Sequence, residues 1–318
     1  MARTFDEWEK PLIDLDKGLE QLKDLNRKNP DPQLETRIIE LERRRDHYLE
    51  VMYSRLGAWE KVLVARAPKR PYTLDYIGQM FTDFVELDGD RRFGADHAIV
   101  GGPASLDGRA VMVVGHQKGR NIQERQFRNF GMAKPEGYRK AIRLFEMAER
   151  FKMPVVTLVD TPAADPGVES EARGISEAIA AGMLAMFELT VPSISVVIGE
   201  GGSGGAIGIA AANTVLMLEH SVYSVIPPEG CAAILWRMPE RGPEAARALR
   251  LTAEAALEFG LIDGIIKEPQ GGAHRDLIEI AASVKGAILT DLAKQDLLSG
   301  AERKETRYRK FRAMGRMA

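Results

Sequence analysis

Residues 193–212 read SISVVIGEGGSGGAIGIAAA and hold the densest run of glycine in the chain, with six glycines at positions 199–208. An apolar segment precedes the glycines and an alanine-rich segment follows them, which predicts a strand, a turn and a helix in that order. Glycine loses much backbone entropy on folding, so this density indicates positive φ angles or close approach of another group to the main-chain amides. Free N–H groups at the start of such a helix favour an anion or a developing oxyanion.

A dinucleotide-binding fingerprint is one interpretation of this run, because Gly199, Gly201 and Gly204 have the required spacing. The run lies in the middle of the chain, however, and Glu219 comes too early to be the acidic residue that such folds place after the glycines. No glycine-lysine-serine or glycine-lysine-threonine ending follows the run, which excludes the phosphate-binding loop of ATPases.

A serine hydrolase is a second interpretation. Gly201, Ser203 and Gly205 match the nucleophile-elbow pattern, and Asp263 and His274 follow in the chain order that α/β-hydrolases use. His274 lies in a stretch typical of a loop, and Asp263 stands beside a glycine in a predicted turn, so neither is marked as catalytic. The hydrolase remains the alternative.

In a third interpretation the amides themselves are the catalytic groups. Peptide N–H groups can stabilise the charge that develops on a carbonyl oxygen, as in enolate formation from a thioester, and this needs small residues rather than reactive ones. The rest of the chain shows no metal-ligand spacing and no outstanding carboxylate pair. Its five histidines are scattered, at His47, His97, His116, His220 and His274.

Strand-like and helix-like segments alternate around the glycine run, which predicts an α/β domain. The expected strands are residues 98–104, 110–115, 155–160, 193–198, 214–217 and 222–226, and the expected helices include residues 136–151 and 175–187. Their order is strand-strand-helix followed by strand-helix units, which differs from the two equal halves of a dinucleotide fold.

The first 70 residues are different, because they contain only two of the 30 glycines. Apolar residues at helical spacing predict one helix from Trp8 to Leu22 and a second from Leu34 to Trp59, separated by the prolines of residues 29–32. We therefore expect a helical hairpin at residues 1–68, an α/β domain at 69–300 and a basic tail at 301–318. The apolar stripe of the hairpin either packs on the rest of the chain or forms a subunit interface.

The tail from residue 303 to residue 318 has seven basic side chains against one acidic side chain. A frayed, solvated helix end and a contact with an acidic partner are the two interpretations.

The whole chain of 318 residues has 44 basic and 46 acidic side chains, a net charge of −2, and gives no global reason to expect a nucleic-acid or membrane partner. The uncharged stretch at 201–218 is better explained by a buried helix and strand than by lipid. A single cysteine, Cys231, excludes a disulfide framework and any zinc site with several thiolates from this chain. We expect a cytoplasmic protein.

Six separated motifs resemble one known family, the carboxyltransferase α subunits of bacterial multi-subunit acetyl-CoA carboxylase. They are IGEGGSGGA at 198–206, GHQKGR at 115–120, NFGM at 129–132, PEGYRKA at 135–141, DTP at 160–162 and SVIPPEGCA at 224–232. The motifs follow the order of the family, and the N-terminal helical hairpin fits it as well, so the resemblance covers nearly the whole chain.

The resemblance implies a crotonase-like fold, a spiral of strand-strand-helix repeats, and an incomplete enzyme. In this family the α subunit pairs with a homologous β subunit that carries a zinc ribbon, and the active site lies between them, typically in an α2β2 assembly. The complex transfers carboxylate from carboxybiotin on the biotin carboxyl carrier protein to acetyl-CoA. The product is malonyl-CoA for fatty-acid synthesis, and a separate biotin carboxylase consumes the ATP. No metal is expected in this chain.

Carried onto this sequence, the resemblance makes the amides of Gly204 and Gly205 the oxyanion hole for the biotin carbonyl oxygen. Gly201, Gly202 and Ser203 are expected to shape the turn. A Gly205→Val change is expected to abolish transfer and leave the assembly intact.

Four further residues are candidates for substrate contact. Lys118 and Arg120 follow a predicted strand and are expected to face an anion, such as a CoA phosphate or the substrate carboxylate, with solvated surface as the alternative. Glu229 and Gly230 stand in another turn and are predicted to be adjacent to the site. An assembly-only subunit without catalytic groups is the remaining structural possibility.

Overall fold

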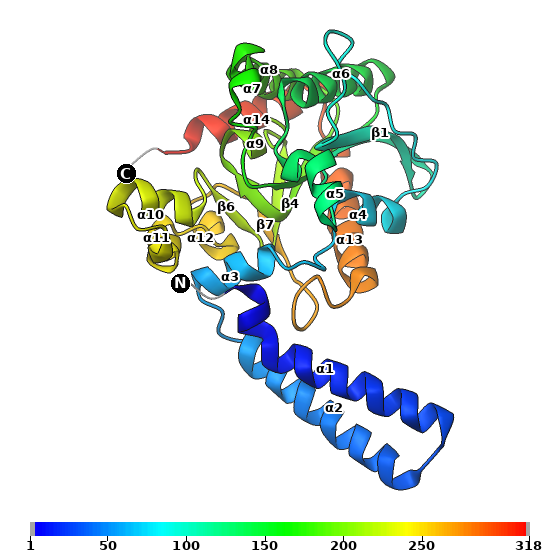
Figure 1. Ribbon diagram of the computed structural model, residues 1–318. Coiled ribbons are helices and arrows are strands. Elements are labelled where there is room, and N and C mark those ends of the chain that lie inside the picture. Colours follow the sequence, from blue (N-terminus) through cyan, green and yellow to red (C-terminus); the bar gives the residue numbers. More distant parts are fainter. Residues whose placement is uncertain (1–3, 316–318) are drawn as a thin grey trace.

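The computed structural model describes residues 4–315, which form an α/β body and a long helical hairpin that projects from it (Figure 1). Within these residues a seven-stranded sheet runs through the body in the order β1-β2-β3-β4-β5-β7, with β6 paired to β4. The strands are β1 (Ile99–Leu106), β2 (Arg109–His116), β3 (Val155–Thr161), β4 (Ser193–Gly202), β5 (Thr214–Leu218), β6 (Val222–Ser224) and β7 (Gly264–Ile266). The six strands predicted from the sequence are confirmed, and β7 is an addition.

The sheet begins as a hairpin and continues as a parallel sheet. Strands β1 and β2 are antiparallel and turn at Asp107 and Gly108, whose φ angles of 49° and 80° are the positive values that a two-residue turn requires. The remaining pairs are parallel, so each needs a long connection, which helices supply. The far end of β4, residues 200–202, pairs with β6, which places the glycine run between two parallel neighbours.

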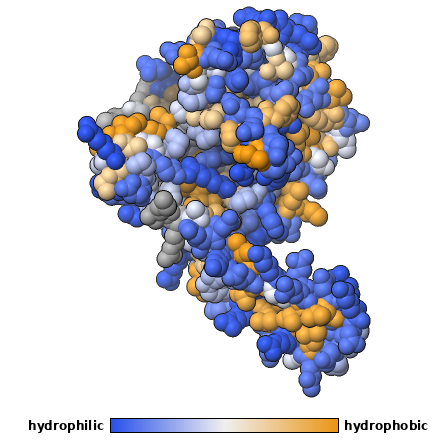
Figure 2. Space-filling model, in the orientation of Figure 1, coloured by the Kyte–Doolittle hydropathy of each residue, from blue (hydrophilic) through white to orange (hydrophobic). Residues whose placement is uncertain are grey.

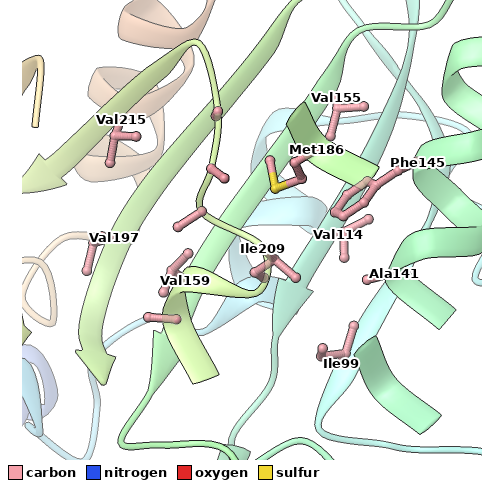
Figure 3. Close-up of a cluster of buried hydrophobic side chains, with 14 of the residues drawn as sticks. Ile99, Val114, Ala141, Phe145, Val155, Val159, Met186, Val197, Ile209 and Val215 are labelled. Carbon is pink, nitrogen blue, oxygen red and sulfur yellow. The ribbon is translucent and has the colours of Figure 1, made fainter. Parts of the chain in front are cut away.

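Helices cover both faces of the sheet, and the side chains of β3 alternate between the two resulting cores. Val155 and Val159 point into the cluster that contains Phe145 of α6 and Met186 of α8, which Figure 3 shows. Val156 and Leu158 belong to the second cluster, which α4 and α13 complete. A central strand buried on both faces has a nearly continuous apolar sequence, as this one does.

The described helices begin in the hairpin and end beside the sheet. They are α1 (Phe5–Lys28), α2 (Pro32–Tyr53), α3 (Ala58–Ala65), α4 (Thr73–Met80), α5 (Ile122–Phe127), α6 (Pro135–Phe151), α7 (Val168–Ala172), α8 (Ile175–Glu188), α9 (Ser203–Ile207), α10 (Pro228–Trp236), α11 (Gly242–Leu249), α12 (Ala253–Glu258), α13 (Leu277–Asp296) and α14 (Gly300–Ala313), with short 3₁₀ turns at Asn129–Gly131 and Pro239–Arg241. The helices expected at 136–151 and 175–187 are confirmed as α6 and α8.

The N-terminal hairpin is confirmed, with one correction. Helix α2 ends at Tyr53, and the predicted extension to Trp59 is wrong because Gly57 starts a separate helix, α3. The root of the hairpin packs on the body, where the buried carboxylate of Glu9 accepts hydrogen bonds from Tyr53 (2.8 Å) and Arg275 (2.7 Å).

Beyond its root the hairpin keeps apolar side chains at its surface. Leu25, Ile39, Tyr48 and Val51 are exposed, and Figure 2 shows apolar surface along this part of the molecule. A subunit interface on the hairpin therefore stays a prediction.

The basic tail forms α14, and its interpretation as a frayed, solvated helix end is wrong for the described residues. Arg307 is fully buried and donates to the carbonyl oxygens of Phe187 (2.9 Å) and Leu189, at the end of α8. Lys310 donates to the carbonyl of Asn213 (2.7 Å). These cations stabilise the carbonyl ends of neighbouring segments, so they are already engaged within the chain. Arg316 lies outside the described residues.

The uncharged stretch at 201–218 spans the end of β4, the short helix α9 and strand β5. Among residues 4–315, no helix has the length and apolar character that crossing a membrane requires.

Candidate active site

The glycine run forms the last part of β4 and the five-residue helix α9. The expected continuation of the helix through the alanines at 210–212 is wrong. Gly204, Gly205 and Gly208 are poor helix formers, and the segment ends in tighter turns, with the Ile209 N–H donating to the Ala206 carbonyl (3.2 Å) and the Ala210 N–H to the Ile207 carbonyl (3.3 Å). Tertiary contacts rather than helix propensity must therefore hold α9.

Two of the glycines allow the loop after β3 to lie directly against the turn. A Cβ at Gly202 would stand 1.9 Å from the Pro162 carbonyl oxygen, and one at Gly205 would stand 2.5 Å from the Ala163 carbonyl carbon. A valine at 205 would push this loop away, so Gly205→Val cannot separate a lost amide donor from a displaced loop. Gly204 has more room, because the nearest atom to a Cβ there is a side-chain carbon of Ile179 at 3.2 Å.

Ser203 has a φ of +53°, in the left-handed region that non-glycine residues rarely adopt. The partners that a hydrolase would need are elsewhere. Asp263 accepts hydrogen bonds from the Val215 N–H (2.7 Å) and from Lys310 (2.8 Å), while His274 lies against Glu9 in the root of the hairpin. The serine, aspartate and histidine therefore form no triad, and the serine hydrolase is not supported.

The N–H groups of Gly204 and Gly205 are unused. They stand in the first turn of α9, where a helix offers no internal acceptor, and none of the hydrogen bonds found in the described chain starts from them. Ser203 and Gly204 line a groove of about 690 Å³. The groove is mostly apolar, and its other walls include Tyr223, Phe259 and Phe311. The Gly204 N–H thus belongs to a residue at the groove, and that of Gly205 follows it in the buried part of the turn. Neighbouring N–H donors of this kind form a site for an oxygen that gains negative charge.

A network of buried charges fixes the strand beside these amides. Lys118 donates to Asp160 Oδ1 (2.7 Å) and to Glu200 Oε2 (2.8 Å), and Arg66 pairs with Glu200 (2.7 Å) and with Glu229. Lys118 and Glu229 thus belong to one charge network beside the strand end. Two carboxylates of its own chain pair with Lys118, which favours a structural role, and its contact with a substrate anion stays a prediction.

The electrostatics of this network act in opposite directions on its two buried carboxylates. Burial alone would raise the pKa of Glu200, but the cations of Lys118 and Arg66 outweigh it and lower the pKa to about 2. Burial raises the pKa of Asp160 against the opposing charge of Lys118. Asp160 also accepts the Glu200 N–H (2.9 Å), and its carboxylate fills the space where a Cβ of Gly199 would stand, 2.4 Å from Oδ1. This contact explains why position 199 is a glycine.

Arg120 and Gly230 have no contact with the amides. Arg120 donates to the carbonyl of Arg70 (2.8 Å) and pairs with Asp75, and its guanidinium lies 4.2 Å above the ring centre of Tyr72. These contacts engage the guanidinium within the chain, and an anion contact of Arg120 stays a prediction. Gly230 stands in the first turn of α10, and a Cβ there would meet only ordinary contacts with Ile226.

Sequence reasoning gave no role to three residues that hold the site. Arg66 and Asp160 belong to the charge network, and Tyr138 donates its hydroxyl to the Gly205 carbonyl (3.2 Å). Asp160 and Tyr138 stand in two of the quoted motifs, which is the only signal that marked them. Among the described residues, no group of three or more histidine, cysteine or acidic side chains could hold a metal ion.

Comparison with solved structures shows the fold of the chain. The transcarboxylase 12S core, solved with methylmalonyl-coenzyme A and methylmalonic acid bound, has 23% sequence identity and a TM-score of 0.54 over 71% of this chain and 44% of its own. A Pseudomonas malonate decarboxylase hetero-tetramer, solved in complex with coenzyme A, has 18% identity and a TM-score of 0.56 over 68% of this chain and 86% of its own. The chain has the crotonase-like fold of these carboxyltransferases.

Sequence comparison gives the particular family. Residues 5–315 match the family described as acetyl co-enzyme A carboxylase carboxyltransferase-like. The carboxyl transferase subunit alpha of acetyl-coenzyme A carboxylase from Geobacter metallireducens is 54% identical over 98% of both chains, and that from Photobacterium profundum is 51% identical over 99% of both. The chain therefore belongs to the family of acetyl-CoA carboxylase carboxyltransferase α subunits. It is a transferase of fatty-acid biosynthesis that works with a β subunit.

Proposed function

We propose that the amides of Gly204 and Gly205 are the catalytic groups of a carboxyltransferase half-site, and that they receive carrier-bound carboxybiotin. The observation that carries this proposal is the pair of unused N–H groups in the first turn of α9, beside an apolar groove. Carboxybiotin supplies the carboxyl group for transfer, and negative charge accumulates on its ring carbonyl oxygen as that group leaves.

The donor set fits this group. Two neutral N–H donors match one carbonyl oxygen, and they bind it more strongly as it becomes negative, so they favour the transition state over the ground state. The apolar walls of the groove exclude water, which strengthens both hydrogen bonds. Gly201 and Gly202 form the close-packed strand end that holds the donors in place, as the contacts of Gly202 with Pro162 indicate.

The site needs its partner. The nearby imidazole of His116 is a poor base, because burial and the charge of Lys118 lower its pKa to about 3. We found no cationic side chain among the residues that line the groove beside Gly204 except Arg250, so this face offers little to the phosphates of CoA. We propose that the homologous β subunit, which carries the zinc ribbon, positions the CoA thioester and supplies the hole for its enolate.

The wider assembly follows from the family. We propose an α2β2 carboxyltransferase to which the biotin carboxyl carrier protein brings carboxybiotin, after a separate biotin carboxylase has loaded it. The network of Arg66, Lys118, Glu200 and Glu229 then serves to hold the strand, and no step of transfer requires these side chains to move a proton.

A proline at position 204 tests the amide assignment. Gly204→Pro removes the N–H, but a proline there also disfavours the left-handed φ of +53° at Ser203, so the fold of the variant is checked beside its activity. Gly204→Ala is the matched control that adds bulk and keeps the donor. Loss of one oxyanion donor lowers kcat by about 10²- to 10³-fold. Both variants would be assembled with the β subunit, checked by mass and thermal unfolding, and assayed for malonyl-CoA formation. A proline variant that assembles and has the kcat of the alanine variant would refute the assignment.

A further inference from the structure

Tyr138 is a buried side chain that contacts α9, the short helix of the proposed oxyanion hole. It stands in the first turn of α6 and is fully buried. Its hydroxyl donates a hydrogen bond to the Gly205 carbonyl oxygen at 3.2 Å. The same residue contributes its ring to the main hydrophobic core, so its position is fixed by packing.

The Gly205 carbonyl needs this partner because the N–H groups that follow it in the described chain donate to other carbonyls. In the tight end of α9, the N–H groups of Gly208, Ile209 and Ala210 donate to the carbonyls of residues 204, 206 and 207. A buried carbonyl without a hydrogen-bond donor costs free energy, and the Tyr138 hydroxyl supplies a donor to this one.

The tyrosine ring also fixes the other end of the helix. A Cβ at Gly208 would stand 2.7 Å from Cε1 of Tyr138, so the ring fills the space that a side chain would occupy. Helix α9 has only five residues, of which two are glycines, and such a helix does not hold its own geometry. One rigid side chain thus contacts both the middle and the end of a segment that cannot orient itself.

We propose that Tyr138 is a positioning residue that sets the direction of the Gly204 and Gly205 N–H groups. The proposal rests on the proposed function of these amides. Burial and the negative charge of Asp96 raise the pKa of Tyr138 well above its usual value, so the hydroxyl is a neutral donor throughout the working range of pH. Tyr138 acts through Gly205 and touches no reacting atom.

Tyr138→Phe removes the hydroxyl and keeps the ring, and Tyr76→Phe is the matched control. Tyr76 is also fully buried, and its hydroxyl has no hydrogen-bond partner in the described part of the chain. It lies on α4 in the second core, on the opposite face of the sheet. Both variants lose a buried tyrosine hydroxyl, but only one loses a contact with α9.

The first measurement is amide hydrogen exchange of the full-length chain. The N–H groups of Gly208, Ile209 and Ala210 bond to carbonyls of α9 and report on its order. We expect their exchange to accelerate at least tenfold in Tyr138→Phe and to remain unchanged in Tyr76→Phe. Equal exchange in both variants would overturn the proposal.

The second measurement is steady-state kinetics of the complex with the β subunit. Misdirected donors weaken transition-state binding and leave substrate binding intact, so we expect Tyr138→Phe to lower kcat about 10- to 100-fold with KM within twofold. An unchanged kcat would also overturn the proposal. Gly204→Pro separates the two hypotheses: if it is inactive while Tyr138→Phe has wild-type kcat, the amides are catalytic and the positioning role fails. If Gly204→Pro is active, the proposed function itself fails.

Discussion

Replacing Lys118 by methionine tests whether this lysine holds the site together or binds substrate. The side chain is 14% exposed and reaches two carboxylates, of which that of Asp160 is 1% exposed. Methionine has a similar length and keeps the apolar contacts of the stem, so the change removes mainly the charge. Glu200 would keep Arg66 at 2.7 Å, whereas Asp160 would lose its only ion-pair partner in the described chain.

The expected loss of folding stability follows from this difference between Glu200, which keeps a partner, and Asp160, which loses its partner. Removing one member of a buried ion pair typically destabilises a protein by about 3–5 kcal/mol, because the other charge is left buried and uncompensated. The double variant Lys118→Met/Asp160→Asn should recover about half of this loss or more, since the amide oxygen of asparagine can still accept the Glu200 N–H at 2.9 Å.

Urea unfolding of the isolated chain measures the four corners of this double-mutant cycle, and steady-state kinetics of the assembled enzyme measures KM for acetyl-CoA. A structural lysine predicts a large loss of stability with recovery in the double variant. A lysine that binds the substrate anion predicts wild-type stability and a raised KM instead, and that result would refute our interpretation of the network.

Three further predictions concern Ser203 in the glycine turn, Arg307 in α14, and the dependence of stability on pH. Ser203→Ala should keep most of the malonyl-CoA-forming activity, because the hydroxyl has no triad partner, and loss of nearly all activity would favour a nucleophile. Ser203→Gly should raise Tm, because relief of the strained φ of +53°, worth about 1–2 kcal/mol, exceeds the cost of the added chain entropy. Arg307→Leu should lower the free energy of unfolding by about 2–4 kcal/mol, since it leaves the buried carbonyls of Phe187 and Leu189 without donors, and urea unfolding with a loss under 0.5 kcal/mol would contradict this. Glu268 forms a second buried ion pair, with Arg70 at 2.6 Å. The cations beside Glu200 and Glu268 lower the pKa of each carboxylate from an ordinary 4.5 to about 2, so both stabilise the fold fully above pH 5 and progressively less as the pH falls towards 2. A stability that is flat over this range would argue against charged buried pairs.

The sequence predicted the layers of the fold well because each layer has a local signal. Short apolar segments gave the strands, and the prolines at 29–32 gave the hairpin turn. The errors arise where the deciding contact is distant or subtle. The break between α2 and α3 depends on Gly57, a single glycine in a helical pattern, and β7 has only three residues, too few for a recognisable pattern.

The site was predictable in its backbone and poorly predictable in its side chains. Glycine density marked the run at 199–208 as a place of close approach or positive φ, and the family resemblance singled out Gly204 and Gly205 within it. The partners of Lys118 lie 42 and 82 residues away in the chain, so a lone basic residue after a strand could not be distinguished from a substrate ligand. Likewise, the basic composition of the tail could not reveal that Arg307 binds the end of α8.

The most direct test of the central claim, that this chain is one half of an active site, is a titration of the purified chain with its β subunit while malonyl-CoA formation is measured. The account predicts no measurable transfer from the chain alone, and a rate that rises with added β subunit and saturates at about one β per α. Transfer by the chain alone at a rate comparable to that of the mixture would contradict it.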